Sequence, residues 1–231
     1  MSAVPLTLGW IAGAVGGSFR GRGETPVHGV VTDSRAMTAG DVFVALRGPR
    51  FDGHAFAAEA LARGAAGVVV EREWAEAHSH AGDGVIGVSD TLEALQETAH
   101  AVRVASAAKV VAITGSAGKT TTKESIAALL ATRFRVVKNQ GNLNNHIGLP
   151  LSLMQLTSGP DVAVMELGMN HAGEIRALVR IASPTSACGP TWATPIWASS
   201  RRWTRLPTPR PRCWRMHARA TCSCARPTTL A

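Results

Sequence analysis

The sequence predicts an α/β fold with two parts, followed by a C-terminal segment of different character. Short apolar runs alternate with segments of helical periodicity, an order typical of parallel sheets. One such run, residues 109–113, leads through a glycine-rich turn into a helix-like segment, as at the phosphate sites of doubly wound folds. We expect a small α/β domain over 1–104, part of a second, parallel-sheet domain over 105–187, and an anomalous tail without regular structure over 188–231.

The first part alternates strand and helix patterns from residue 26 to residue 100. The helix expected over 52–65 places Phe56, Ala60 and Leu61 on one face. The last helix has Ser89 and Asp90 at its start, residues that commonly cap helices. The expected strands are 27–31, 40–48 and 66–71, and the expected helices are 52–65 and 89–106.

The second part repeats this order. Residues 109–115 form a short, largely apolar run, as strands buried on both faces of a parallel sheet require. The further expected strands are 135–139 and 161–169, and the expected helices are 119–134, 144–156 and 171–182.

Charge and cysteine content change abruptly near residue 188. The net charge is +8, but residues 188–231 contain eight arginines and no lysine or acidic residue, so 1–187 is neutral. All four cysteines lie in this tail. No apolar run reaches the ~18 residues of a membrane span. The N-terminal segment is mildly apolar, but no basic residue stands before its apolar part, whereas a signal peptide would require one. We therefore expect a cytoplasmic protein without a signal peptide.

The turn after residues 109–113 has the composition of a phosphate-binding loop. It lacks the first glycine of the full G-x-x-x-x-G-K-[ST] pattern, since Ile113 stands there. Its glycines allow several N–H groups to turn toward a phosphate at a helix N-terminus. The lysine can neutralise phosphate charge and the first threonine can bind Mg²⁺. An ordinary glycine turn is the alternative. The candidate ATP-binding residues are Thr114, Gly115, Ser116, Ala117, Gly118, Lys119, Thr120 and Thr121.

A carboxylate follows at the end of the strand expected over 161–169. Ligands of open α/β sheets bind at the carboxyl ends of strands, and Glu166 lies there. It could hold Mg²⁺ together with Thr120, or be a solvated strand-end acid.

Other polar clusters have two interpretations each. Asn144, Asn145 and His146 precede an expected helix. Asn145 could cap it, and His146 is interpreted as a structural hydrogen-bonding residue. Asp33, Ser34 and Arg35 could bind a diphosphate, or form a polar turn with a local Asp–Arg pair. Two further segments are either helix starts or, by the family resemblance described next, site residues: Asp52, Gly53 and His54, and Asn170, His171, Gly173 and Glu174.

Several segments resemble the Mur ligases, cytoplasmic ATP-dependent amide ligases that build the peptidoglycan stem peptide. Residues 113–130, ITGSAGKTTTKESIAALL, match the family's ATP loop, T-G-[ST]-x-G-K-T-[TS]. Residues 33–71 look like its UDP-sugar-binding domain. Residues 139–156 and 164–178 look like the member that joins D-alanyl-D-alanine to UDP-MurNAc-tripeptide, and the resemblance covers about 26–187.

This resemblance implies ATP and Mg²⁺, with Lys119 as a catalytic residue and Asn145 near the nucleotide. Asp33, Ser34 and Arg35 would contact UDP-MurNAc, and Thr120 and Glu166 the metal. It implies a monomer that acts on small molecules, without nucleic acid or membrane. Another Mur ligase, such as the tripeptide-forming enzyme, is the alternative.

The tail has three interpretations. A zinc site is disfavoured because it would need two pairs of cysteines of the C-x₂₋₄-C type. The spacing of Cys188, Cys213, Cys222 and Cys224 does not give two such pairs. An arginine-rich arm with tryptophans would make the chain a non-enzymatic nucleic-acid-binding protein.

The third interpretation is a shifted reading frame. Residues 190–200, read one nucleotide earlier, are compatible with T-N-V-G-H-A-H-L-G-V-F, a family motif whose histidine helps to hold a second metal. Residues 203–214 are compatible with the family's lysine motif. We expect a frameshift near residues 187–190 and no ligase activity in this chain, which the coding DNA and a phosphate-release assay would test.

Overall fold

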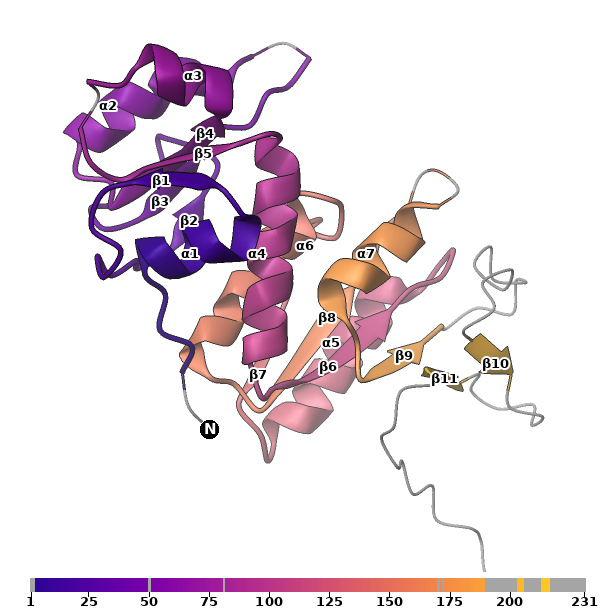
Figure 1. Cartoon of the computed structure of the whole chain (residues 1–231). Coiled ribbons are helices and arrows are strands. Elements are labelled where there is room, and N and C mark those ends of the chain that lie inside the picture. Colours follow the sequence, from indigo (N-terminus) through magenta and orange to yellow (C-terminus); the bar gives the residue numbers. More distant parts are fainter. Residues whose placement is uncertain are drawn as a thin grey trace, which may run out of the picture.

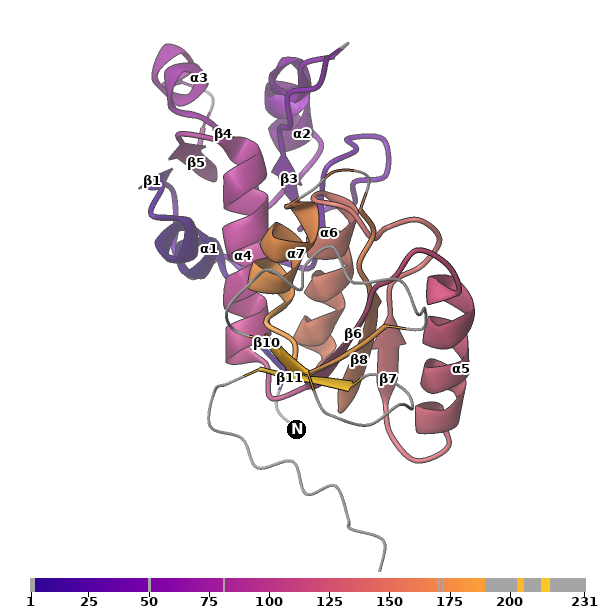
Figure 2. The same ribbon diagram turned by 90° about the vertical axis from the view of Figure 1, so that its right-hand side faces the viewer.

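The computed structural model describes residues 3–49, 51–80, 82–169, 171, 173–189, 203–205 and 213–216, with only the backbone of the last two segments. Two sheets lie on either side of one long helix, α4 (Figure 1). The view from the side shows helices on both faces of the second sheet (Figure 2). The predicted α/β class is thereby confirmed.

The first sheet has the strand order β1-β5-β4-β3-β2. All neighbours are parallel except β1, which pairs antiparallel with β5 at the edge. Runs of valine form its buried strands, as β-branched side chains favour. Its elements are α1 (Leu8–Val15), β1 (Ser18–Arg20), β2 (Val30–Val31), β3 (Val42–Val44), η1 (Gly53–Phe56), α2 (Ala57–Ala62), β4 (Gly67–Glu71), α3 (Arg72–Ala77) and β5 (Val85–Val88).

The second sheet has the order β10-β11-β9-β6-β8-β7, and its β9-β6-β8-β7 portion is parallel throughout. Helix α5 covers one face, while α6 and α7 cover the other (Figure 2). Its elements are β6 (Lys109–Ile113), α5 (Lys119–Ala131), β7 (Val136–Lys138), α6 (Gly148–Leu153), η2 (Met154–Ser158), β8 (Val162–Glu166), α7 (Glu174–Ala182), β9 (Ser186–Cys188), β10 (Trp203–Arg205) and β11 (Cys213–Met216).

Helix α4 (Thr91–Ala105) connects the two sheets. It begins as expected, because Asp90 Oδ1 accepts hydrogen bonds from the N–H groups of Leu92 and Glu93 at 2.7 and 2.9 Å. One continuous apolar core includes residues of both sheets and of α4. It contains Val44, Val69, Ile86, Ala94, Leu95, Ala99, Val102, Val110, Ala112, Ala163 and Met165.

Polar contacts at the C-terminal end of α4 add to this packing. The Arg103 guanidinium donates to the main-chain oxygens of Ala182 and Ser183, both at 3.1 Å. These oxygens belong to the C-terminal end of α7, where helix carbonyls lack partners. Arg103 therefore holds the ends of α4 and α7 together.

Two details differ from the expected elements. The helix expected over 52–65 begins as the 3₁₀ turn η1, with three residues per turn, so Phe56 leaves the apolar face and is 44% exposed while Ala60 is buried. Residues 203–205 and 213–216 of the tail form β10 and β11, an antiparallel pair that extends the sheet beside β9. In the part of the chain described, no helix has both the length and the apolar character of a membrane span.

Candidate functional site

The glycine-rich turn lies between β6 and α5, as the sequence predicts. Gly115 has φ 152° and Gly118 has φ 75°, and Gly118 is the N-cap of α5. L-residues with side chains rarely adopt such angles, so both glycines are needed for this path of the backbone. The turn leaves the N-terminal N–H groups of a 13-residue helix at the carboxyl edge of the sheet. These groups and the helix dipole favour an anion there.

The side chains of the turn fall into two groups. Thr114 is buried, and its N–H binds the main-chain oxygen of Cys188 at 3.1 Å, so it attaches the loop to β9. Lys119 bends back, and its Nζ donates to the Gly115 oxygen at 2.9 Å. This bond keeps the ammonium group over the turn. Ser116, Ala117, Thr120 and Thr121 are exposed at the start of the helix.

Glu166 meets this turn from the end of β8, as its strand-end position predicts. Its side chain is 3% exposed, and each carboxylate oxygen has a partner. The Thr120 hydroxyl donates to Oε2 at 2.8 Å, and Asn144 Nδ2 donates to Oε1 at 2.9 Å. The two bonds fix the orientation of the carboxylate. As a result, the Thr120 hydroxyl oxygen of α5 and Glu166 Oε2 of β8 lie side by side near Lys119.

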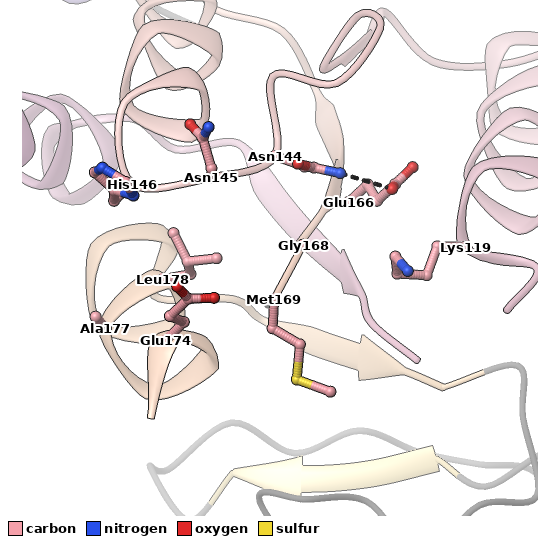
Figure 3. A pocket seen from close by; sticks show the side chains of 10 residues that line it. All are labelled: Lys119, Asn144, Asn145, His146, Glu166, Gly168, Met169, Glu174, Ala177 and Leu178. Carbon is pink, nitrogen blue, oxygen red and sulfur yellow. Dashed lines mark hydrogen bonds between the residues drawn. The ribbon is translucent and has the colours of Figure 1, made fainter. Parts of the chain in front are cut away.

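A cavity of about 380 Å³ opens at this edge (Figure 3). Lys119 and Glu166 lie on one side of it, while the start of α7 and the loop before α6 form the other side. The lining residues are Lys119, Asn144, Asn145, His146, Glu166, Gly168, Met169, Glu174, Ala177 and Leu178. The cavity therefore combines a cation and an anion at one end with a mixed polar and apolar wall at the other.

Magnesium fits the pair of oxygens contributed by Thr120 and Glu166. Mg²⁺ is bound in proteins by one or two carboxylate or hydroxyl oxygens and takes its other ligands from water and phosphate. These two oxygen atoms lie 2.8 Å apart, beside a lysine and a helix N-terminus that attract phosphate. The described residues contain no group of three or more His, Cys, Asp and Glu side chains that would form an all-protein metal site.

Asn145 and the segment after Glu166 show helix-start chemistry. Asn145 Oδ1 accepts the N–H groups of Ile147 and Gly148 at 3.1 and 2.8 Å, so the expected capping is confirmed. The His171 N–H and Nδ1 both contact Glu174, at the start of α7. Asn145 lines the cavity as well, and its contact with a nucleotide remains a prediction. Asn170 lies outside the described residues.

The N-terminal candidates Asp33, Ser34 and Arg35 follow strand β2 of the first sheet and do not line this cavity. Arg35 and Asp33 form the local pair considered above, with contacts of 2.9 and 2.7 Å. The Arg35 guanidinium, as hydrogen-bond donor, lowers the pKa of Asp33 to about 2. The main-chain oxygen of Ser34 accepts a hydrogen bond from the Arg63 guanidinium at 2.9 Å. Binding of a UDP-sugar by Asp33, Ser34 and Arg35 remains a prediction.

Asp52 and His54 form the start of a helix, which was one of the two interpretations. Asp52 Oδ1 accepts the N–H of His54 at 3.0 Å and lies 2.6 Å from its Nδ1. His54 Nε2 accepts the Glu71 N–H at 2.9 Å, so both nitrogens of this buried ring are occupied.

The sequence interpretation missed two residues of the site, Gly168 and Asn139, and it gave Asn144 no contact with Glu166. Asn144 orients the Glu166 carboxylate. Gly168 makes room for the Asn144 side chain, because a Cβ at Gly168 would lie 2.6 Å from Asn144 Oδ1. Asn139 binds the main chain of Glu166. Asn139 is the last residue of the strand expected over 135–139, and that position alone could have marked it, since ends of parallel strands meet at one edge.

Two family models match the chain. The Mur ligase family, catalytic domain, matches residues 26–103, and the Mur ligase middle domain matches residues 113–188. The chain belongs to the Mur ligase family. The second match contains the whole glycine-rich turn and Glu166, so the Mur ligase resemblance of the sequence is confirmed.

Similar proteins agree with this assignment. UDP-N-acetylmuramoyl-tripeptide–D-alanyl-D-alanine ligase of Bacillus subtilis is 45% identical over 165 residues, which are 71% of this chain and 35% of the relative. A solved UDP-N-acetylmuramoylalanyl-D-glutamyl-2,6-diaminopimelate–D-alanyl-D-alanyl ligase from Acinetobacter baumannii superimposes with a TM-score of 0.74 at 37% identity, covering 82% of this chain and 42% of that one.

A third relative was solved with a nucleotide. The MurF ligase of Thermotoga maritima in complex with ADP has a TM-score of 0.61 at 36% identity, and the match covers 70% of this chain and 37% of that one. This chain therefore spans less than half of the length of the Mur ligases that it matches.

Proposed function

We propose that this chain is the nucleotide-binding portion of a Mur ligase that joins D-alanyl-D-alanine to UDP-MurNAc-tripeptide at the expense of ATP. One observation carries the proposal: Lys119, Thr120 and Glu166 converge at the carboxyl edge of a parallel sheet, at the start of α5. The names of the Bacillus subtilis and Acinetobacter baumannii relatives support the choice of substrates. The complex of the Thermotoga maritima relative with ADP supports the choice of nucleotide.

Each residue of the turn has a role in this proposal. The N–H groups from Gly115 to Thr120 bind the phosphates, and Lys119 exchanges its bond to the Gly115 oxygen for one to the terminal phosphate. Thr120 and Glu166 would hold Mg²⁺, which when bound would neutralise charge on the phosphates. Asn144 keeps Glu166 turned toward Thr120.

The proposed reaction is formation of an amide through an acyl phosphate. The terminal carboxylate of the tripeptide attacks the γ-phosphorus of ATP, and ADP leaves. The amine of D-alanyl-D-alanine then attacks the acyl carbon and loses one proton, and inorganic phosphate leaves with the C–O electron pair and takes up that proton. The residues of this chain contribute mainly position and charge neutralisation to the first step.

The N-terminal sheet is proposed to bind the UDP-sugar. Its turn at Asp33, Ser34 and Arg35 exposes a guanidinium group to solvent, with 88% of the Arg35 side chain accessible. Its pairing with Asp33 would have to open or be shared when a diphosphate binds. The domain limits at residues 104 and 187 are part of this proposal.

Calorimetry with ADP and Mg²⁺ tests the proposal on the whole chain. We expect saturable binding that is weakened at least about tenfold in Lys119→Met and retained in Lys109→Met, which changes an exposed lysine of the second sheet. Equal binding by the two variants would show that Lys119 does not contact the nucleotide.

Two further measurements concern the substrate and the turnover. Tighter binding of UDP-MurNAc-tripeptide than of UDP-MurNAc-dipeptide would distinguish the proposed member from the tripeptide-forming ligase. Phosphate release from ATP, UDP-MurNAc-tripeptide and D-alanyl-D-alanine tests the expectation that these 231 residues alone do not turn over.

A further inference from the structure

The side chain of Asn139 takes the place of a missing strand beside the end of β8. Strand β7 pairs with β8 only as far as Lys138, which lies opposite Val164. On the other side of β8, the Leu167 N–H binds the Ile113 oxygen at 2.8 Å. Since peptide groups alternate in direction along a strand, the N–H and C=O of Glu166 point to the side where β7 has already ended.

The Asn139 carboxamide satisfies both of these groups. Its Oδ1 accepts the Glu166 N–H at 2.9 Å, and its Nδ2 donates to the Glu166 oxygen at 3.0 Å. The side chain is fully buried, where an unpaired peptide group would be costly. Asn139 therefore fixes the backbone of the residue that presents the carboxylate.

The second hydrogen of Asn139 Nδ2 is used as well. It is donated to the Leu143 oxygen at 2.9 Å, which holds the turn just before Asn144. Asn144 in turn donates to Glu166 Oε1 at 2.9 Å. A single side chain thus determines the main-chain position of Glu166 and supports the residue that orients its carboxylate.

Lys123 connects this arrangement to the helix that carries Thr120. The Lys123 side chain is buried, and its Nζ donates to the main-chain oxygen of Asn139 at 2.9 Å and lies 3.3 Å from Glu124 Oε1. Lys123 is three residues after Thr120 in α5, on a neighbouring position of the helix surface. The strand end and the helix start are therefore joined through Asn139.

We propose that Asn139 is a positioning residue for the pair of Thr120 and Glu166, and that Lys123 holds it in place. The inference rests on the proposed function for its ligand, a magnesium nucleotide. Asn139 would act on the geometry of the two oxygen donors without touching the nucleotide. Its loss should therefore weaken the contribution of Mg²⁺ to nucleotide binding more than binding of the nucleotide alone.

Calorimetry of the full chain with ADP, with and without Mg²⁺, measures this difference. Asn139→Leu keeps a similar volume and removes all three hydrogen bonds. We expect ADP affinity without metal to stay within about twofold, and the gain from Mg²⁺ to fall by about tenfold, which is the effect of ~1.4 kcal/mol. Asn142→Leu, in the exposed part of the same loop, should leave both affinities unchanged.

Asn139→Asp provides a second variant if Asn139→Leu does not fold. It keeps the shape and the acceptor but loses both donors, and we expect the same selective loss. An unchanged gain from Mg²⁺ in a folded variant would overturn the proposal. Equal losses with and without Mg²⁺ would also overturn it, because they would indicate general damage to the loop.

Hydrogen exchange of the Glu166 amide, followed by NMR, gives a measurement that does not depend on nucleotide. We expect this amide to be protected in the parent chain and to exchange faster in Asn139→Asp or Asn139→Leu. If the parent chain does not bind ADP, the proposed function is wrong, but this exchange still decides whether Asn139 positions Glu166. Unchanged protection would exclude the positioning role.

Discussion

The hydroxyl of Thr120 and the carboxylate of Glu166 are hydrogen-bonded at 2.8 Å, although 46 positions separate the two residues in sequence. Thr120 lies in the first turn of α5 and Glu166 at the end of β8. The bond shows that the strand order brings the loop and the acid to one point.

Replacement of Lys119 by methionine should weaken ADP binding by at least about tenfold. The variant keeps most of the aliphatic stem but removes a charge-assisted bond to phosphate, and such bonds contribute roughly 1.5–3 kcal/mol. Calorimetry gives the affinity, and Lys109→Met is the matched control. Similar affinities for the parent chain and Lys119→Met would show that this lysine does not contact the nucleotide.

Glu166→Gln should reduce the gain in ADP affinity produced by Mg²⁺ by about tenfold or more, because a neutral amide oxygen is a weaker ligand than a carboxylate. ADP binding without metal should be unchanged or slightly tighter, since one negative charge near the phosphates is removed. Titrations in Mg²⁺ and in a chelator measure both values. Glu97→Gln, which changes a surface pair with Arg180, should behave like the parent chain.

Arg103→Met should lower the free energy of unfolding by about 2 kcal/mol, because it leaves the Ala182 and Ser183 carbonyls at the end of α7 without their donor. Arg103→Lys should recover little of this, since one ammonium group cannot reproduce the forked geometry. Denaturant unfolding measures both. Arg133→Met changes an exposed residue and should stay within about 0.5 kcal/mol of the parent chain.

The stability of the fold should fall at acid pH partly through Asp52. The His54 N–H is the main cause that lowers the pKa of Asp52 to about 2, and Arg47 adds to it. A carboxyl with a lowered pKa stabilises the folded state above its unfolded pKa of ~3.9, and this contribution is lost as the pH falls toward 2. Unfolding of Asp52→Asn should therefore depend less steeply on pH between about 4 and 2. The same slope as in the parent chain would contradict the assignment.

The main elements of the fold could be predicted because they depend on local patterns. Apolar runs such as 110–113 and 162–165 are short and rich in β-branched residues, and Asp90 caps its helix as the sequence indicates. The sequence pattern placed Phe56 on the buried face of the expected helix, which is wrong. Residue composition does not distinguish a 3₁₀ turn from an α-helical turn. Only the packing of η1 against its surroundings selects between them.

For the candidate site, the sequence identified the side chains that are candidates for binding phosphate and metal. Lys119, Thr120 and Glu166 stand where a strand meets a turn, and strand ends of a parallel sheet share one edge. Asn145 likewise caps a helix, as an asparagine before an apolar run often does.

The tertiary structure alone decided which side chains hold those groups in place. Asn139 ends an expected strand and Asn144 lies in a loop, but the sequence does not indicate which groups these two side chains bind. Lys123 resembles any helix lysine. Their roles depend on β7 ending before β8, which leaves the N–H and C=O of Glu166 without a strand partner. The lack of a strand partner for these peptide groups follows from the order and length of the strands. Because buried peptide groups must be hydrogen-bonded, a side chain that the fold brings there has to supply the partners. No local pattern of residues records it.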